Sequence, residues 1–341
     1  MQPEIRAALD TLFSHQSLDR NSVQEAIGAI MDGRCEPVEI SALLTAFAMK
    51  GETETEIAGA AAAMRERAIR IPTAQTGLID TCGTGGDNLH TFNISTAAAL
   101  VVAATGQPVA KHGNRSVSSS SGSADVLESL GVNIDLSVEQ AGRCLDDVGI
   151  CFCYARVCHQ AMKHVAPVRA ALARRTIFNL LGPLTNPARA DYQLIGAFRA
   201  DIARKLAGAI SKLGTKRTLV VCGNDQLDEV SLWGITQVFD VQGESLTDHL
   251  WTAETFGLPE CRPEQLRVSS AGESADVIRK LIAGEESPAF NMVLANAAAA
   301  LFCGSRAETP AEGVDVARHA IQSGLVSQKL EELREWTQSV R

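Results

Sequence analysis

The chain has 341 residues, is 45% hydrophobic and 21% charged, and carries a net charge of -9 at neutral pH. That length fits one large domain, or a large and a small one, with a well-buried core. The negative charge and the 4% aromatic content argue against a primary role in binding nucleic acid, which favours basic surfaces and stacking aromatics.

Three further properties lead us to expect a cytoplasmic protein. No run approaches the ~20 apolar residues that span a bilayer, so we expect no membrane partner. The N-terminus lacks a basic region followed by an apolar one, so we expect no secretion. The nine cysteines form an odd number without framework spacing, and we expect reduced thiols.

The first 70 residues or so have the pattern of helices only. One helix is expected to have Asn21 or Ser22 as its cap and to end at Asp32-Gly33. A second is expected from about Pro37 to Gly51 and a third from about Thr55 to Ala68. Helices this short cannot bury their apolar faces alone, so they must pack on each other, on the rest of the chain or on a second subunit.

From about residue 76, short apolar runs alternate with helical stretches. This alternation predicts an α/β fold with a mainly parallel central sheet flanked by helices. Binding sites in such sheets lie beyond the C-terminal ends of the strands. A helical stretch at 161–181 interrupts the alternation, and the chain is mainly helical from about residue 273. Strands are expected at 78–80, 108–110, 149–154, 192–198, 217–222 and 237–241, and helices at 95–104, 123–130, 201–213 and 291–301, with a further helix capped by Ser137 and Gln140.

A glycine-rich loop, Asp80 to Asp87, follows the first predicted strand. Glycine lets the backbone approach an anion, and a helix N-terminus offers unpaired donors and a positive dipole end. The loop fails the dinucleotide fingerprint because Asn88 stands at the third glycine position, and no Gly-Lys-Ser/Thr of a Walker loop follows. Taken alone, the loop could equally be a glycine turn that only connects a strand to a helix.

A second loop follows the next predicted strand and brings Lys111, His112 and Arg115 beside Asn114 and several serines. The alternative is a solvated loop with incidental charge. Because the protein as a whole is negative, bases concentrated at the end of a strand favour an anion site.

Asp228 and Glu229 form an adjacent carboxylate pair after the strand predicted at 217–222. Such a pair alone is usually a solvated surface feature. Mg²⁺ prefers one or two carboxylates together with waters and substrate phosphates, so the pair favours magnesium beside two phosphate-like loops. Opposite a hydroxyl such as Ser95, the pair would clamp a diphosphate.

The cluster of Cys151, Cys153, Cys158 and His159 invites a zinc interpretation. Its spacing does not match a structural zinc site, and the first two cysteines share one face of an apolar strand, so small hydrophobic roles are expected. On the helical stretch that follows, Arg169 is the best carboxylate clamp, because its planar guanidinium matches a carboxylate.

Seven motifs are far more specific together than either loop alone: 83–87, 91–96, 111–119, 122–125, 162–169, 175–187 and 227–229. Over nearly the whole chain they resemble the anthranilate phosphoribosyltransferase family. The resemblance implies a small helical domain, residues 1–72, joined by a helical insert at about 165–190, and a large α/β domain, residues 73–341, of the nucleoside phosphorylase type. It also implies a homodimer formed through the helical domain.

The implied reaction transfers the phosphoribosyl group from phosphoribosyl diphosphate (PRPP) to anthranilate, giving N-(5-phosphoribosyl)anthranilate and diphosphate, in tryptophan biosynthesis. The resemblance implies Mg²⁺, two ions per subunit, on Ser95, Asp228 and Glu229. It implies anthranilate contacts from Gly83, Asn114 and Arg169. The implied PRPP contacts come from both loops: Gly83, Gly86, Asp87, Thr91, Asn93, Ile94, Ser95, Thr96, Lys111, His112, Gly113, Asn114, Arg115, Ser116, Val117, Ser118, Ser119 and Ser123.

The expected mechanism is displacement at the sugar C1 through an oxocarbenium-like state. Magnesium and Lys111 would offset the charge that builds on the leaving diphosphate. An aromatic amine is neutral at pH 7 and already nucleophilic, so no strong base is demanded, and positioning supplies much of the rest. Lys111, Arg169 and His112 are the expected catalytic residues, with Arg169 near the acceptor carboxylate and His112 as an acceptor of the amine proton after attack.

The sequence departs from the family pattern in four places: Asn88 and Gln226 each replace a glycine, Gln160 replaces a proline, and Tyr154-Ala155-Arg156 is also unusual. Two other functions stay open at this point. One is a related phosphoribosyltransferase or phosphorylase with another acceptor, and the other is a non-catalytic binding paralogue. Arg169 favours anthranilate over other acceptors, and the intact Asp228-Glu229 pair speaks against the paralogue.

Overall fold

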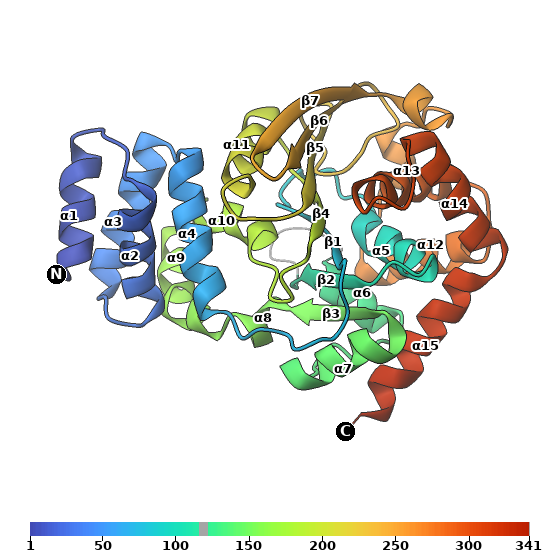
Figure 1. Cartoon of the computed structure of the whole chain (residues 1–341), viewed down its shortest axis with the longest axis horizontal. Helices are drawn as coiled ribbons and strands as arrows, with labels where there is room; N and C mark the ends of the chain where they lie inside the picture. Colours follow the sequence, from blue (N-terminus) through green and yellow to red (C-terminus); the bar gives the residue numbers. More distant parts are fainter. Residues whose placement is uncertain (116–121, 341) are drawn as a thin grey trace.

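The computed structural model describes residues 1–115 and 122–340. Four N-terminal helices form a bundle beside a larger α/β region built on one seven-stranded sheet (Figure 1). The predicted fold class, a small helical part and a mainly parallel sheet flanked by helices, is confirmed. In the described part of the chain, no helix is both long enough and apolar enough to cross a membrane.

The bundle consists of α1 (Pro3–Phe13), α2 (Arg20–Met31), α3 (Pro37–Lys50) and α4 (Glu54–Arg67). The predicted cap of α2 is wrong by two or three residues. Asp19 is the cap, because its carboxylate accepts the backbone N–H of Ser22 at 2.9 Å. Apolar residues at helical spacing, such as Ile27, Leu43 and Ile57, are fully buried.

The sheet has the strand order β3-β2-β1-β4-β5-β6-β7. Its first five strands are parallel, and β6 and β7 add to the β5 edge as an antiparallel hairpin. The strand β7 is not predicted from the sequence, since most of its side chains are exposed and polar. The strands are β1 (Ile79–Gly83), β2 (Val109–Gly113), β3 (Ile150–Tyr154), β4 (Tyr192–Gly196), β5 (Arg217–Gly223), β6 (Thr236–Gln242) and β7 (Ser245–Trp251).

Helices cover both faces of the sheet (Figure 1). The buried residues of α5, α13, α14 and α15 pack with one face in a large core. The opposite face packs with α11 in a second core, to which the four bundle helices also contribute. The other helices are α5 (Ile94–Ala104), α6 (Ser123–Ser129), α7 (Val138–Val148), α8 (Ala155–Cys158), α11 (Ala200–Ile210), α12 (Ala271–Ile282), α13 (Pro288–Cys303), α14 (Pro310–Gln322) and α15 (Leu325–Ser339), with 3-10 turns η3 (Ala253–Phe256) and η4 (Pro263–Leu266).

The predicted helical stretch at 161–181 is a series of short helices: η1 (Gln160–His164), α9 (Ala166–Leu172), α10 (Phe178–Leu181) and η2 (Gly182–Leu184). Val165, Val168 and Ile177 are buried in the second core, together with bundle residues. The stretch therefore packs against the bundle although it lies between two strands of the sheet.

Candidate active site

A cavity of about 380 Å³ opens beyond the C-terminal ends of β1 and β2, where sites of parallel sheets are expected. Both predicted loops and the carboxylate pair meet there. Among the predicted residues, Thr96 and Arg169 do not line it, and Ser116, Val117, Ser118 and Ser119 fall outside the described residues. The lining consists of residues 82–87, 90–95, 111–115, 122–123, 175, 179, 228 and 229.

The helix α5 points its N-terminus at this cavity. The cap is Asn93, whose side-chain oxygen accepts the backbone N–H of Thr96 at 3.0 Å. Thr96 is fully buried and supports the helix start instead of facing the cavity. The positive dipole end of α5 therefore lies beside Ser95, where an anion would be stabilised.

Gly83 ends β1 against the carboxylate pair. A Cβ at this position would collide with the Asp228 carboxylate. One Asp228 oxygen also accepts the backbone N–H of Gly85 at 2.7 Å. Glycine is therefore required at residue 83 for the loop to lie directly on Asp228.

Asn88 adopts a left-handed backbone with φ of 57°. Asparagine is one of the few residues besides glycine that visits this region readily. The departure from the family's glycine is therefore compatible with the loop, because the backbone there needs a positive φ.

Lys111 and His112 lie within β2 and not in the loop after it, so the predicted strand end at 110 is wrong. Both pair with β3 in parallel register. The Lys111 ammonium donates to Thr81 O at 2.6 Å and to Ser95 Oγ at 3.2 Å. Burial lowers its pKa, and the nearby Asp80 carboxylate opposes that shift. Lys111 therefore lies beside the start of α5, and the Asp80 carboxylate favours its charged form.

The imidazole of His112 is held at both nitrogens. Nδ1 lies 3.1 Å from Gly182 O, and Nε2 lies 3.2 Å from Nε2 of His159. Since a carbonyl only accepts, Nδ1 of His112 carries the proton, and Nε2 of His112 accepts from His159. Burial lowers the pKa of His112 to about 3 and that of His159 to about 4. These contacts weigh against His112 as the proton acceptor, because so weak a base is a poor one at neutral pH.

The buried histidine pair predicts a loss of stability in acid. Both residues bind a proton in the unfolded chain near the ordinary pKa of 6.5 but not in the native protein until about pH 4 or 3. The native state is therefore favoured above pH 6.5 and loses this advantage as the pH falls. The free energy of unfolding can be measured by urea at pH 6.5 and at pH 5. Between these two pH values it should fall in both proteins, but by about 1 to 2 kcal/mol less in His159→Asn than in the wild type.

Asparagine at residue 159 keeps a donor for His112 while removing one titrating group. His249→Asn, at an exposed histidine, is the matched control and should follow the wild type. Parallel pH profiles for wild type and His159→Asn would contradict the buried, neutral assignment.

Three carboxylates crowd one wall of the cavity. Burial, and then the charge of Asp87, raise the pKa of Asp228 to about 7. Burial and the Asp228 charge raise the pKa of Glu229 well above its usual value, and the Lys111 charge opposes that shift. Burial also raises the pKa of Asp87. A divalent cation would relieve this repulsion, so the donor set fits Mg²⁺.

The cluster does not enclose a metal by itself. Within residues 1–115 and 122–340, no three histidine, cysteine or acidic side chains form a complete metal-binding group. Mg²⁺ needs no such group, because it usually keeps waters and binds substrate phosphates. Cys151 and Cys153, expected to act as small hydrophobic residues, are buried with their sulfurs 3.7 Å apart, and all nine cysteines are free thiols.

Arg115 has acidic partners next to the cavity. Its guanidinium donates to Asp125 at 2.9 Å and to both Glu128 oxygens at 2.5 and 2.7 Å. These hydrogen bonds raise its pKa. To bind PRPP as predicted, Arg115 would have to share its guanidinium with these carboxylates.

Arg175 lines the cavity and was not assigned a role from the sequence. Its guanidinium donates to Gly85 O at 3.1 Å and lies 4.1 Å from the Phe198 ring centre. The same segment contributes Asn179. The only sequence signal was a basic residue at the start of the motif 175–187, with nothing to show that it meets the glycine loop.

Arg169 lies on α9, outside the lining of the cavity. Its guanidinium is 5.8 Å from the centre of the Phe178 ring, and burial lowers its pKa. Its guanidinium therefore packs on an aromatic ring, on the segment that joins the bundle to the cavity.

Comparisons with known proteins agree with this geometry. The α/β domain of a glycosyl transferase family matches residues 75–326, and the helical bundle domain of that family matches residues 6–68. An anthranilate phosphoribosyltransferase from Symbiobacterium thermophilum is 45% identical over 337 residues, covering 99% of each chain.

Solved structures show the same similarity. The Thermus thermophilus anthranilate phosphoribosyltransferase has a TM-score of 0.91 and 40% identity, covering 97% of this chain and 99% of that one. The Saccharomyces cerevisiae protein, solved in complex with PRPP and Mg, has a TM-score of 0.92 and 25% identity, covering 100% and 99%. A second structure of the yeast protein holds 4-fluoroanthranilate.

Proposed function

The chain belongs to the anthranilate phosphoribosyltransferase family, and we propose that it transfers the phosphoribosyl group of PRPP to anthranilate in tryptophan biosynthesis. One observation carries this proposal: the glycine loop, the end of β2 and the Asp228-Glu229 pair line a single cavity. PRPP and Mg bound to the yeast protein support the choice of donor and ion, and 4-fluoroanthranilate supports the choice of acceptor.

The residues divide into a phosphate side and an acceptor side. The glycine loop and the N-terminus of α5 would face the diphosphate, and Lys111 would offset the charge that develops on it. Ser95, Asp228 and Glu229 would hold Mg²⁺, in two ions per subunit. Bound there, Mg²⁺ would neutralise charge on the leaving diphosphate. Arg175 adds positive charge at the rim, where Arg115 shares its guanidinium with Asp125 and Glu128.

On the acceptor side, we assign Gly83, Asn114 and Arg169 to anthranilate. Arg169 would pair with the acceptor carboxylate, which its fork-shaped guanidinium matches. His112 is a positioning residue, because both its nitrogens are already engaged. The acceptor amine is neutral at pH 7, so the chain need only hold it in line with the sugar C1.

An assay tests the proposal directly. The protein is mixed with PRPP, Mg²⁺ and anthranilate, and the loss of anthranilate fluorescence is followed. Turnover is expected, with no loss of signal when PRPP is omitted. Folded protein that shows no turnover would refute the proposal, and turnover with another aromatic acceptor alone would support a related transferase.

Replacing Arg169 by alanine should affect the acceptor much more than the donor. The KM for anthranilate is expected to rise about 10- to 100-fold, since a charge-assisted pair is lost, while the KM for PRPP stays within about twofold. Steady-state kinetics with each substrate varied would measure both. Arg174→Ala, at an exposed arginine nearby, is the control. Equal loss for both substrates would contradict the assignment.

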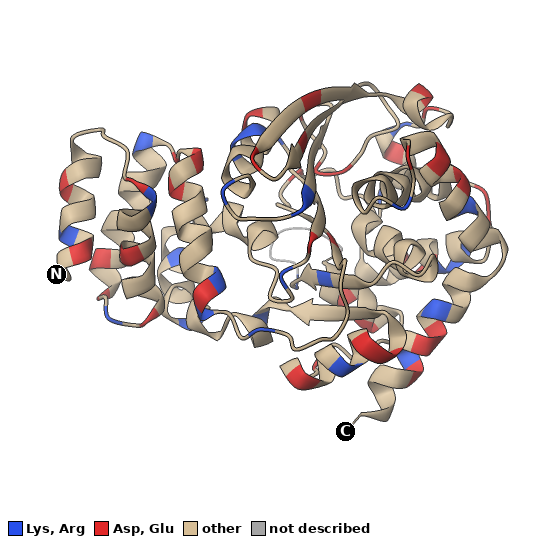
Figure 2. Ribbon diagram, in the orientation of Figure 1, with Lys and Arg blue, Asp and Glu red and all other residues tan. Residues whose placement is uncertain are grey.

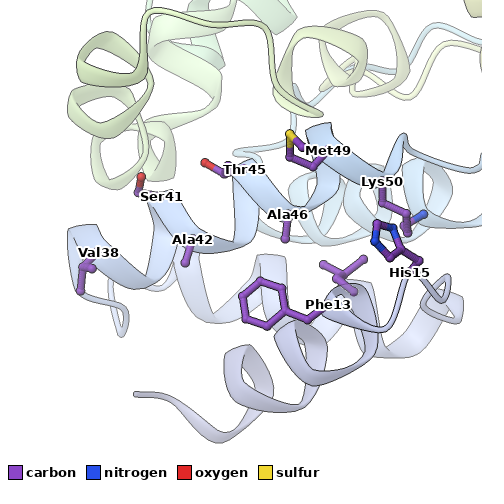
Figure 3. Close-up of a pocket in the computed structure, with 10 residues that line it drawn as sticks. Phe13, His15, Val38, Ser41, Ala42, Thr45, Ala46, Met49 and Lys50 are labelled. Atoms are coloured by element: carbon purple, nitrogen blue, oxygen red, sulfur yellow. The ribbon is translucent and has the colours of Figure 1, made fainter.

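We also propose a homodimer formed through the helical bundle. An apolar groove of about 490 Å³ runs between α1 and α3 (Figure 3). Phe13, Val38 and Met49 line it and are 69%, 73% and 79% exposed. Exposed apolar patches of this kind mark protein interfaces. Phe13→Asp with Met49→Asp should convert a dimer into a monomer in sedimentation, and a wild-type monomer would contradict the proposal.

We propose residues 1–72 as the helical domain, with 165–190 packed on it, and 73–341 as the α/β domain. The burial of Val165 and Ile177 in the second core supports placing the insert with the bundle. We place the protein in the cytoplasm, and its nine free thiols support a reducing compartment.

A further inference from the structure

A smaller cavity, away from the catalytic one, is lined by three arginines. Its volume is about 190 Å³, and Arg65, Arg70 and Arg189 contribute to its walls. It lies where the connector that follows α4 meets the turn before β4, since Ile71 N–H donates to Pro187 O at 3.3 Å. Figure 1 shows this connector leaving the bundle, and Figure 2 shows basic segments at the end of α4 and along it.

The arginines of this cavity lack acidic partners. Arg65 donates only to carbonyls, from Nε to Leu184 O at 2.6 Å and from Nη1 to Leu213 O at 3.0 Å. In the described part of the chain, no carboxylate lies within 4.0 Å of any of the three guanidinium groups. The adjacent Arg67, by contrast, is paired with Asp32 at 2.6 Å. In a chain of net charge -9, unneutralised cations gathered in one cavity are unusual.

The carboxylate that also lines the cavity is directed elsewhere. Glu66 accepts a hydrogen bond from Gln24 of α2, and its other oxygen lies 3.5 Å from Arg67. Burial, and then the positive charges of Arg189 and Arg20, lower the pKa of Arg65 to about 10. Arg189 therefore repels Arg65, and an anion between them would relieve that repulsion.

The backbone that presents Arg189 is in an unfavourable conformation. Its φ is 54°, in the left-handed region that most side chains avoid. A tight turn fixes it, because Asn186 accepts the N–H groups of Ala188 at 2.9 Å and Arg189 at 3.1 Å. Backbone strain of this kind often marks a functional position.

We propose that this cavity binds a phosphate group, either free or as a small phosphate monoester, at a site separate from the catalytic cavity. Guanidinium forks match phosphate oxygens in bidentate pairs. The volume equals that of about six waters at roughly 30 Å³ each, which is enough for a phosphate with a small substituent. The lining is mainly polar, with Ala68 and Pro187 as its apolar residues, so it does not select a hydrophobic ligand.

The occupied cavity would be connected to the catalytic strands. Asn186, which lines it, donates to Asp80 Oδ2 of β1 and to Ala110 O of β2, both at 2.8 Å. Asp80 in turn accepts the backbone N–H of His112 at 2.9 Å. A phosphate held here would therefore bridge the two connectors of the bundle and steady the strands that carry both catalytic loops.

The test compares wild type with Arg189→Gly, which removes the guanidinium and suits the left-handed backbone. Crystals soaked in selenate should show an anomalous peak beside Arg70 and Arg189 in the wild type and none there in the variant. Calorimetric titrations of both proteins with inorganic phosphate and with glycerol 3-phosphate should show a binding event in the wild type. In Arg189→Gly this event should be absent or its affinity about tenfold weaker. The probe bound more tightly identifies the free or esterified ligand.

Folding is checked without added phosphate, where Arg189→Gly should unfold at or above the wild-type temperature. Phosphate should raise the wild-type midpoint more than that of the variant. Arg262→Gln, at an exposed arginine of another surface, should behave as wild type. An absent selenate peak, a peak that persists in Arg189→Gly, or equal affinities in both proteins would overturn the proposal. None of these readouts depends on transferase activity.

Discussion

Exchanging Asp228 for asparagine and Glu229 for glutamine together should abolish Mg²⁺-dependent turnover, with kcat/KM lower by about 1,000-fold or more. The change is nearly isosteric, so the wall of the cavity keeps its shape. It removes two carboxylates whose charged form is disfavoured by burial and by their mutual repulsion. A 1,000-fold fall in kcat/KM corresponds to about 4 kcal/mol of lost transition-state stabilisation.

The same double substitution should stabilise the metal-free protein. A native pKa of about 7 for Asp228, against an ordinary value of 3.8, means that the native site binds a proton which the unfolded chain releases. The metal-free wild type therefore loses stability as the pH rises from about 4 to 7. At pH 8 the double variant should be more stable by about 1 to 3 kcal/mol, allowing for partial solvent screening of half-buried groups.

Two measurements separate these effects. Urea unfolding without metal at pH 8 reports the gain in stability, and added Mg²⁺ with diphosphate should stabilise only the wild type. Asp248→Asn, at an exposed aspartate, is the control and should change neither activity nor metal response. A double variant that keeps Mg²⁺-dependent turnover, or is less stable at pH 8, would refute the clamp.

Lys111→Met is expected to have the next largest effect, a fall of about 100- to 1,000-fold in kcat/KM. Methionine replaces the apolar stem of lysine and fills the same space within β2. The variant lacks the cation beside Ser95 that would meet the charge developing on diphosphate. Because this charge is largest in the transition state, kcat should fall more than the KM for PRPP rises.

A structural side effect must be distinguished from this loss. Thr81 O and Ser95 Oγ each lose a donor, and the buried Asp80 loses a nearby cation. Stability should therefore fall as well, and kinetics should be measured at a temperature where circular dichroism shows a folded protein. Lys163→Met, at an exposed lysine, should be neutral in both measurements. Near-normal kcat in folded Lys111→Met would exclude the electrostatic role.

Patterns of neighbouring residues predicted the ends of most helices and strands to within two or three residues. The helices at Pro37 and Glu54 and the capping box at Ser137 depend on side chains next to the helix start, which the sequence contains. The extension of β2 through Lys111 and His112 was missed, because charged residues rarely continue a buried strand. Here the partners that allow it, Thr81 O and Gly182 O, come from distant segments.

In the candidate site, too, features set by neighbouring residues were predictable and contacts between distant segments were not. Glycine loops and an adjacent carboxylate pair are short motifs, so the sequence predicted that they belong to one site. The contacts of Arg175 with Gly85 and of Arg115 with Glu128 join residues from separate elements. No local pattern predicts such pairs, because they depend on how the helices pack around the cavity. The tautomers of His112 and His159 likewise become definite only when both rings are placed.

The core that continues from the bundle into the sheet has a consequence for synthesis of the chain. Leu44 and Ile57 are buried with Leu206, Val220 and Val241, which the ribosome makes much later. At ~5–20 residues per second, the bundle waits on the order of ten to thirty seconds for these partners. During that interval it exposes apolar side chains at the ribosome exit, where chaperones act. Destabilising substitutions at this shared boundary should therefore lower the yield of soluble protein more than the equilibrium stability alone predicts.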